Sequence, residues 1–138
     1  MDKKFNCILL VDDDKATNFL NKRLLSRMDI AHTIQIARNG VEAEEYLKKS
    51  MANEPGFPKP DLIFLDINMP LINGWEFLTR YEHLPDNFKN SILILMLTTS
   101  LREVDAERAQ SSPFISGLIY KPLTELEIKK AILQHLAA

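Results

Sequence analysis

Five short apolar runs, separated by segments with helical spacing, constrain this chain most strongly. Most of the runs lack an alternation of apolar and polar residues, which is typical of strands buried on both faces of a sheet. Between them, apolar residues recur at helical spacing, as in Phe19, Leu20, Leu24 and Met28. Strands that alternate with helices predict right-handed βαβ units. We therefore predict an α/β fold, a doubly wound five-stranded parallel sheet whose five βα repeats use residues 1–138 as one domain. The predicted strands are Cys7–Val11, Thr33–Ala37, Leu62–Leu65, Ile92–Leu97 and Leu118–Tyr120.

Four of the predicted helices begin with a capping pattern, in which a side chain that can accept a backbone N–H is followed three residues later by Glu. Two of them start at Asn-Gly pairs, which usually indicate hairpin turns, but a helical pattern follows each pair here. The four pairs are Asn39 and Glu42, Asn73 and Glu76, Ser100 and Glu103, and Thr124 and Glu127.

One irregular stretch, residues 51–60, contains three prolines and a glycine. It is too long for a minimal connection between a helix and a strand. We interpret it as a surface insertion, which serves either as a passive loop or as a contact for a partner.

Composition and charge exclude several classes of protein. Hydrophobic residues make up 46% and charged residues 26%, the balance of an ordinary globular domain. The formal net charge is −2 and no dense Lys/Arg run occurs, so nucleic-acid binding is not expected. The apolar runs are too short to cross a bilayer, and the N-terminus has no signal-peptide pattern. The single cysteine, Cys7, sits in an apolar run, and a buried inert thiol fits a reducing compartment. We therefore expect a cytoplasmic protein without a membrane partner.

Polar residues gather where the predicted strands end. In an open parallel sheet, functional groups lie outside the carboxyl ends of the strands. The first strand is followed by three aspartates, the third by one aspartate, the fourth by three hydroxyl residues and the fifth by a lysine. These residues are Asp12, Asp13 and Asp14, then Asp66, then Thr98 to Ser100, then Lys121.

The chemistry of this set follows from charge. Neighbouring aspartates repel and raise one another's pKa unless a cation intervenes. Mg²⁺ is typically held by one or two carboxylates together with waters and phosphate oxygens. A nearby carboxylate, Asp66, then stays ionised and can attack phosphorus. The phosphoryl oxygens require a hydroxyl and an ammonium, which Thr98 and Lys121 would supply. No His/Cys cluster with metal-ligand spacing occurs.

Each of these residues also has a plainer interpretation. Asp14 is interpreted as the cap of the following helix, whereas Asp12 and Asp13 are interpreted as metal ligands because their strand end faces Asp66. Taken alone, Asp66 could be a turn residue, Thr98 a helix-start hydroxyl and Lys121 a solvated surface lysine. Their convergence from four strands on one edge of the sheet favours a common site.

The sequence resembles the receiver domain of two-component response regulators, of the chemotaxis-regulator type. The resemblance covers nearly the whole chain and follows the family's order of motifs. It rests on ILLVDDD at residues 8–14, PDLIFLDINMP at residues 60–70 with Gly74, ILMLT at residues 94–98, and YKP at residues 120–122. It implies a flavodoxin-like (βα)5 fold with strand order 2-1-3-4-5.

The resemblance also implies a role for each residue of the site. Asp66 would be the phosphoacceptor, Asp13 a direct Mg²⁺ ligand and Asp12 a ligand acting through water. The backbone carbonyl of Asn68 would be a further metal ligand. Thr98 would hydrogen-bond the phosphoryl group and Lys121 would pair with it. The Lys121–Pro122 peptide bond is expected to be cis, as is usual in the family.

The implied function is a step in a phosphorelay and not an enzymatic activity on a separate substrate. A sensor histidine kinase or a histidine phosphotransfer protein would donate a phosphoryl group from phosphohistidine to Asp66, and slow self-catalysed dephosphorylation would follow. Because the sequence ends at Ala138, soon after the last predicted helix, we expect a stand-alone receiver. Its output would be a changed affinity for a protein target, through the surface formed by the fourth helix, fifth strand and fifth helix. We expect a monomer or a weak dimer.

Two departures from the family pattern concern the transmission of the signal. Leu118 stands where the family often has an aromatic residue, and whether Tyr120 takes over its switching role is left open. Thr99 stands where the family often has Ala, and the larger side chain is expected to restrict access to the phosphoryl group.

Three other functions agree less well with the sequence. A phosphatase of the haloacid-dehalogenase type needs Asp-x-Asp-x-Thr/Val after the first strand, and residues 12–16 fail at the last position. A pseudo-receiver that never accepts phosphate is opposed by the complete set of site residues. A nucleotide-binding P-loop is excluded because no Gly-Lys-Ser/Thr sequence occurs.

Overall fold

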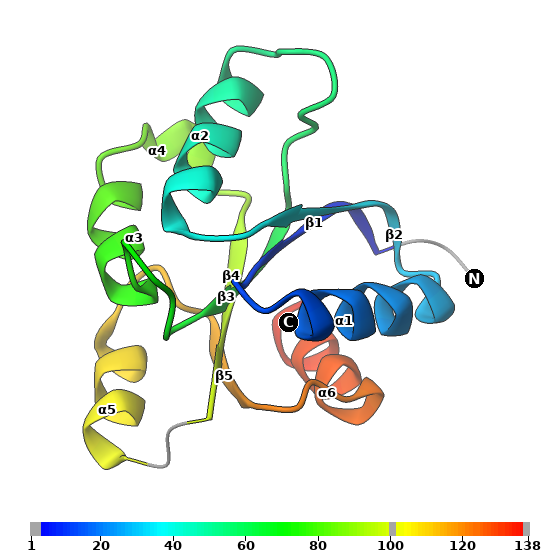
Figure 1. The fold of residues 1–138 in the computed structure, drawn as a ribbon, viewed down its shortest axis with the longest axis vertical. Coiled ribbons are helices and arrows are strands. Elements are labelled where there is room, and N and C mark those ends of the chain that lie inside the picture. Colours follow the sequence, from blue (N-terminus) through cyan, green and yellow to red (C-terminus); the bar gives the residue numbers. More distant parts are fainter. Residues whose placement is uncertain (1–3, 100–101, 137–138) are drawn as a thin grey trace.

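The computed structural model describes residues 4–99 and 102–136, and its centre is a five-stranded parallel sheet (Figure 1). The strands pair in the order β2-β1-β3-β4-β5, which confirms the predicted fold class and strand order. The predicted strand bounds were correct to within two residues. The strands are β1 (Phe5–Val11), β2 (Ala31–Ala37), β3 (Leu62–Asp66), β4 (Leu93–Thr98) and β5 (Gly117–Tyr120).

Six helices connect or follow these strands within the described residues. They are α1 (Lys15–Met28), α2 (Gly40–Met51), α3 (Gly74–Tyr81), α4 (Asp86–Lys89), α5 (Glu103–Ser111) and α6 (Glu125–Leu136). The short helix α4 was not predicted. It has Pro85 at its N-cap position and lies between α3 and β4, so the fourth and fifth helices of the predicted repeats are α5 and α6.

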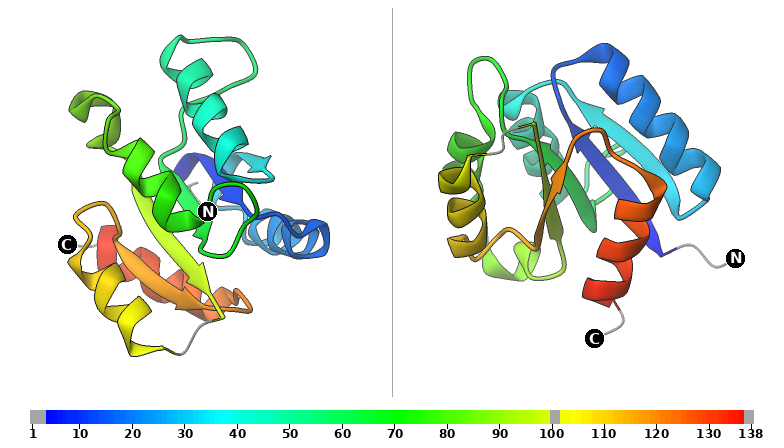
Figure 2. Two further views of the ribbon diagram at one scale, coloured as in Figure 1. Left: turned by 60° about the vertical axis from the view of Figure 1, so that its left-hand side comes forward. Right: turned by 90° about the horizontal axis from the view of Figure 1, so that it is seen from below.

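The helices form two layers around the sheet, one on each face (Figure 2). On one face, residues such as Leu9, Ile63 and Met96 share a core with α2, α3 and α5. On the other face, residues such as Ile8, Phe64 and Leu97 share a core with α1 and α6. Adjacent strand residues thus enter different cores, which explains why the strand sequences are apolar on both sides and do not alternate.

Three of the predicted helix starts have the expected hydrogen bonds. The Asn39 and Asn73 side chains accept from the backbone N–H of Glu42 and Glu76, and Asn73 forms the complete reciprocal capping box. Thr124 Oγ1 accepts from the Glu127 N–H at 3.2 Å.

The predicted start of α5 was wrong. The helix begins at Glu103, with Arg102 at the N-cap position and no side-chain cap bond. The proposed cap residue, Ser100, lies outside the described residues. The capping pattern had placed the helix start two residues too early.

The stretch after α2 is held against that helix. Tyr46 donates its hydroxyl to the Pro58 carbonyl at 2.6 Å, and its ring meets Phe57 edge-on with centroids 5.3 Å apart. Cys7 is fully buried beside the Tyr46 hydroxyl, and burial raises the pKa of its thiol. The predicted buried thiol is therefore confirmed.

Among residues 4–99 and 102–136, no helix combines the length and the apolar character needed to span a membrane.

Candidate functional site

Strand register brings the predicted site residues to one edge of the sheet. Val11 lies opposite Leu65 in the pairing of β1 with β3, so Asp12 and Asp66 are the next residues along two adjacent strands. Asp66 in turn lies opposite Leu97 of β4, and Thr98 follows at the next position. The Lys121 N–H donates to the Thr98 carbonyl at 2.8 Å, which places the end of β5 at the same edge. Four strands therefore contribute to one cluster.

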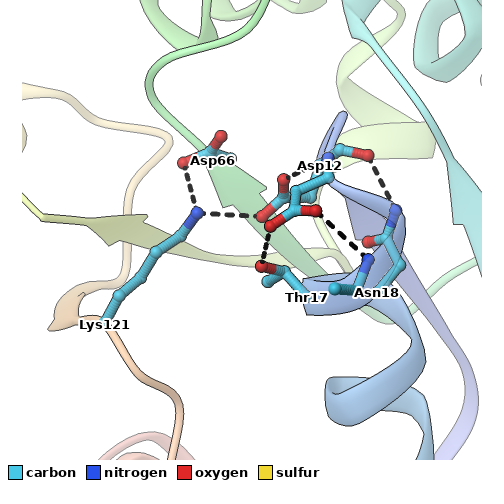
Figure 3. A network of polar contacts seen from close by, with 7 residues as sticks. Asp12, Thr17, Asn18, Asp66 and Lys121 are labelled. Atoms are coloured by element: carbon cyan, nitrogen blue, oxygen red, sulfur yellow. Dashed lines mark hydrogen bonds and ion pairs between the residues drawn. The ribbon is translucent and has the colours of Figure 1, made fainter.

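Lys121 joins the two buried carboxylates of this cluster (Figure 3). Its Nζ lies 2.9 Å from Asp12 Oδ2 and 2.9 Å from Asp66 Oδ1. Burial alone would lower the pKa of the ammonium, but the hydrogen bonds to Asp12 and Asp66 outweigh that effect and raise the pKa. Lys121 is therefore held as a cation between two carboxylates.

Three carboxylates are close enough to share a metal ion. One oxygen each from Asp12, Asp13 and Asp66 lies within 4.8 Å of the others. Asp12 and Asp66 are buried, at 3% and 5% exposure, while Asp13 is exposed. Burial raises the pKa of Asp66, Lys121 opposes this, and the charge of Asp12 adds to the rise. Ionisation of Asp66 is thus less favourable in the protein than in water despite Lys121, and a further cation at this position would reduce that cost.

Asp14 acts differently from the two aspartates before it. Its carboxylate accepts from the Ala16 N–H at 3.1 Å and from Thr17 Oγ1 at 2.7 Å, so it caps α1 as predicted. The hydrogen bond from Thr17, followed by that from Ala16, lowers the pKa of Asp14.

One residue of the site, Asn18, was missed by the sequence analysis. It lies in α1, is only 4% exposed, and donates from Nδ2 to the Asp12 carbonyl at 2.8 Å (Figure 3). The Asp12 side chain also accepts the Asp14 N–H at 3.0 Å. An asparagine one turn into an amphipathic helix carries no pattern that distinguishes it from a surface polar residue.

The loop after β3 is fixed by Gly74 at the start of α3. The Gly74 N–H donates to the Ile67 carbonyl at 2.7 Å, and a Cβ at this position would lie 2.6 Å from the Asp66 main-chain oxygen. Only glycine permits this close approach without a shift of the backbone. The helix start and the Asp66 peptide are therefore packed directly together.

The remaining predicted residues lie around the cluster. Thr98 is buried at 1% exposure, whereas Asn68 and Thr99 are exposed. Leu118 is half-buried against the core, and Tyr120 is 46% exposed on the outside of the sheet. The Lys121–Pro122 bond is cis, as expected.

Helix α5 contacts α3 near the loop between β3 and α3. The Arg108 guanidinium lies 4.4 Å from the centroid of the Trp75 ring, a cation–π contact between the two helices. Trp75 directly follows Gly74, so this contact connects α5 with the segment that carries Asp66.

Comparison with known proteins decides the family. The model of the response regulator receiver domain matches residues 8–133. The chain is a member of the response regulator receiver domain family. Receiver domains are signalling domains of two-component systems, and the recognition of this family from the sequence is therefore confirmed.

Individual relatives agree with this assignment. The response regulator Rcp1 of Synechocystis sp. is 38% identical over 98 residues, which are 71% of this chain and 65% of Rcp1. A two-component response regulator from Cytophaga hutchinsonii has a structure with a TM-score of 0.87 and 30% identity, covering 99% of this chain and 100% of that one.

A solved structure of Rcp1 was obtained in a Mn²⁺-bound form. It has a TM-score of 0.73 and 29% identity, covering 95% of this receiver domain and 94% of that chain. A divalent metal is thus bound in a relative with the same fold, and this chain has an aspartate cluster of suitable chemistry.

Proposed function

We propose that this receiver domain accepts a phosphoryl group on Asp66, in a Mg²⁺-dependent reaction with a phosphohistidine donor, and signals by changing its affinity for a protein target. The donor would be a sensor histidine kinase or a histidine phosphotransfer protein. The proposed role is that of a phosphoacceptor that assists its own phosphorylation and dephosphorylation.

The observation that carries the proposal is the position of Lys121 between Asp12 and Asp66, 2.9 Å from a carboxylate oxygen of each. This arrangement places an ammonium beside the oxygen atoms of the proposed acceptor, where it can pair with an incoming phosphoryl group. An ammonium paired with two buried carboxylates differs from a solvated surface lysine, which is the plainer interpretation of this residue.

The donor set fits Mg²⁺. Hard divalent cations prefer oxygen ligands, and Mg²⁺ is typically held by one or two carboxylates with waters and phosphate oxygens. Asp12, Asp13 and Asp66 would hold it, with the main-chain carbonyl of Asn68 as a further ligand. When bound, the cation would offset part of the negative charge of the carboxylates and of the phosphoryl oxygens.

Three residues of this chain would act directly in the reaction. A carboxylate oxygen of Asp66 forms a bond to phosphorus while the phosphorus–nitrogen bond of the donor breaks; the departing imidazole nitrogen keeps the electron pair and takes up a proton. Lys121 pairs with the transferred group, and Thr98 donates its hydroxyl to it. Because Asp13 is exposed, the donor would reach Asp66 from the side of Asp13. The Thr99 side chain would restrict this access.

The proposed output surface is formed by α5, β5 and α6, the counterparts of the predicted fourth helix, fifth strand and fifth helix. Val104 of α5 and Tyr120 of β5 are 57% and 46% exposed, which gives this surface apolar groups for a partner. Lys121 directly follows Tyr120, so a movement of Lys121 toward the phosphoryl group would pull on β5.

Phosphorylation with acetyl phosphate tests the proposal. The wild-type protein and Asp66→Asn are incubated with the donor, with Mg²⁺ or with EDTA, and the phosphorylated fraction is measured by intact-protein mass spectrometry. We expect label only on wild type and only with Mg²⁺. Equal labelling of the two proteins would contradict the assignment of Asp66, and equal labelling in EDTA would contradict the metal dependence.

A further inference from the structure

Asp13 occupies an unusual position in the carboxylate cluster. Its carboxylate lies within 4.8 Å of those of Asp12 and Asp66, yet within the described part of the chain it makes no hydrogen bond or ion pair of its own. Asp12 and Asp66, in contrast, are buried and bonded to Lys121. The place of the Asp13 carboxylate therefore depends on the backbone that carries it.

That backbone is held from α1 by Asn18. The Asn18 Nδ2 donates to the carbonyl of Asp12, which belongs to the peptide linking Asp12 to Asp13, at a distance of 2.8 Å. The Asn18 N–H donates to the Asp14 carbonyl at 3.0 Å. Asn18 therefore contacts the turn on both sides of Asp13, once through its side chain and once through its backbone.

The environment of Asn18 is unfavourable for an amide. The residue is 4% exposed, and its Oδ1 has no hydrogen-bond partner among the described residues. A buried acceptor without a partner lowers stability, and an apolar side chain of the same size would avoid that loss. An amide that is unfavourable for packing but bonded to the peptide before a candidate metal ligand points to a role in the site.

We propose that Asn18 is a positioning residue for the divalent-cation site: its amide fixes the Asp12–Asp13 peptide and thereby sets where Asp13 presents its carboxylate. This inference rests on the proposed function insofar as the same cation supports phosphorylation of Asp66. Groups that orient metal ligands affect metal affinity strongly, and their removal typically weakens binding by about 10–100-fold.

The test compares two buried asparagines of the same helix. Asn18→Leu removes the amide donor and keeps the branched shape and the number of heavy atoms of the side chain. Asn21→Leu is the matched control, because Asn21 is also buried in α1, at 7% exposure. Among the described residues its side chain makes no hydrogen bond or ion pair with the carboxylates. The dissociation constant for Mg²⁺ alone is measured by calorimetry, and thermal unfolding is measured in EDTA.

We expect Asn18→Leu to bind Mg²⁺ about tenfold more weakly than wild type, whereas Asn21→Leu stays within about twofold. The unfolding temperature of Asn18→Leu in EDTA should stay close to that of wild type, because the lost hydrogen bond and the removed unpaired oxygen act in opposite directions. A purely structural role would instead lower the unfolding temperature and leave the Mg²⁺ affinity of the folded protein unchanged.

A second variant keeps the test decisive if leucine is not tolerated. Asn18→Ser is smaller and its hydroxyl is too short to replace the amide, so the same loss of Mg²⁺ affinity is expected. Affinities of both variants within twofold of wild type would overturn the inference. A different result would contradict the proposed function and not this inference: wild type would bind Mg²⁺ but would take no phosphoryl group from acetyl phosphate.

Discussion

Gly74 offers the sharpest test of how the fold holds Asp66. A Cβ at this position would lie 2.6 Å from the Asp66 carbonyl oxygen and 3.0 Å from the Ile67 Cα. Both are backbone atoms, so no side-chain rotation can relieve the contact. We predict that Gly74→Ala destabilises the protein and displaces the segment that carries the proposed phosphoacceptor.

The magnitude follows from two opposing effects. Alanine in a helix is more favourable than glycine by about 0.5–1 kcal/mol. Overpacking of a well-packed region costs about 1–3 kcal/mol, and contact with rigid backbone favours the upper end of that range. The expected net loss is about 2 kcal/mol, which lowers the unfolding temperature of a domain of this size by roughly 5–10 °C.

Thermal unfolding followed by circular dichroism measures this loss, and labelling by acetyl phosphate with Mg²⁺ measures the displacement of Asp66. Gly40→Ala is the control: there a Cβ would lie 3.0 Å from Ile72 Cβ and 3.2 Å from the Ile72 carbonyl oxygen, so a smaller shift relieves the contact. It should cost less stability and leave labelling unchanged. A Gly74→Ala protein as stable as wild type and labelled at the same rate would refute the reasoning.

Three further predictions concern charge in the folded state. Because burial raises the pKa of Asp66, the folded state loses stability as the pH rises from the ordinary pKa of this carboxyl to the raised one, and the loss persists at higher pH. Asp66→Asn avoids this loss, so it should unfold at a higher temperature than wild type at pH 7 in EDTA. An equal or lower unfolding temperature would count against this. Lys121→Ala should still be phosphorylated by acetyl phosphate in Mg²⁺. On phosphorylation, however, the NMR signals of its α5, β5 and α6 amides should not shift as they do in wild type. Shifts as large as those of wild type would contradict the role of Lys121. Burial raises the pKa of Tyr81 to about 12, so the folded state holds this proton more tightly than the unfolded state. The free energy of unfolding should therefore fall by about 2 kcal/mol as the pH rises from 10 to 12. Tyr81→Phe should not show this decrease when the free energy of unfolding is measured by denaturant titration at pH 10 and pH 12. An identical decrease in both proteins would contradict the raised pKa of Tyr81.

The sheet could be predicted from the sequence because burial on both faces leaves a clear mark. Runs such as the one around Ile63 are apolar at successive positions, and the residues after them are polar. The rule that functional groups lie beyond the carboxyl ends of parallel strands then placed Asp12 near Asp66 without any structure. The order of the strands came from the family resemblance, because an apolar run does not indicate which strands lie beside it in the sheet.

What the sequence did not show depends on side-chain geometry or on very short elements. A four-residue helix such as α4 has too few positions for a hydrophobic period. The bonds of Lys121 to two carboxylates, and of Asn18 to a main-chain carbonyl, depend on rotamers that the fold selects. The helix start at Glu103 shows that a capping pattern alone does not fix where a helix begins.

The contact between Arg108 and Trp75 has a practical consequence. Trp75 is the only tryptophan in the sequence, and the guanidinium of α5 lies 4.4 Å from its ring centroid. The unlabelled protein therefore contains its own optical probe at the junction between α3 and α5. Any event at Asp66 that separates these helices changes the polarity around one indole, so its emission can follow signalling in real time without an attached dye.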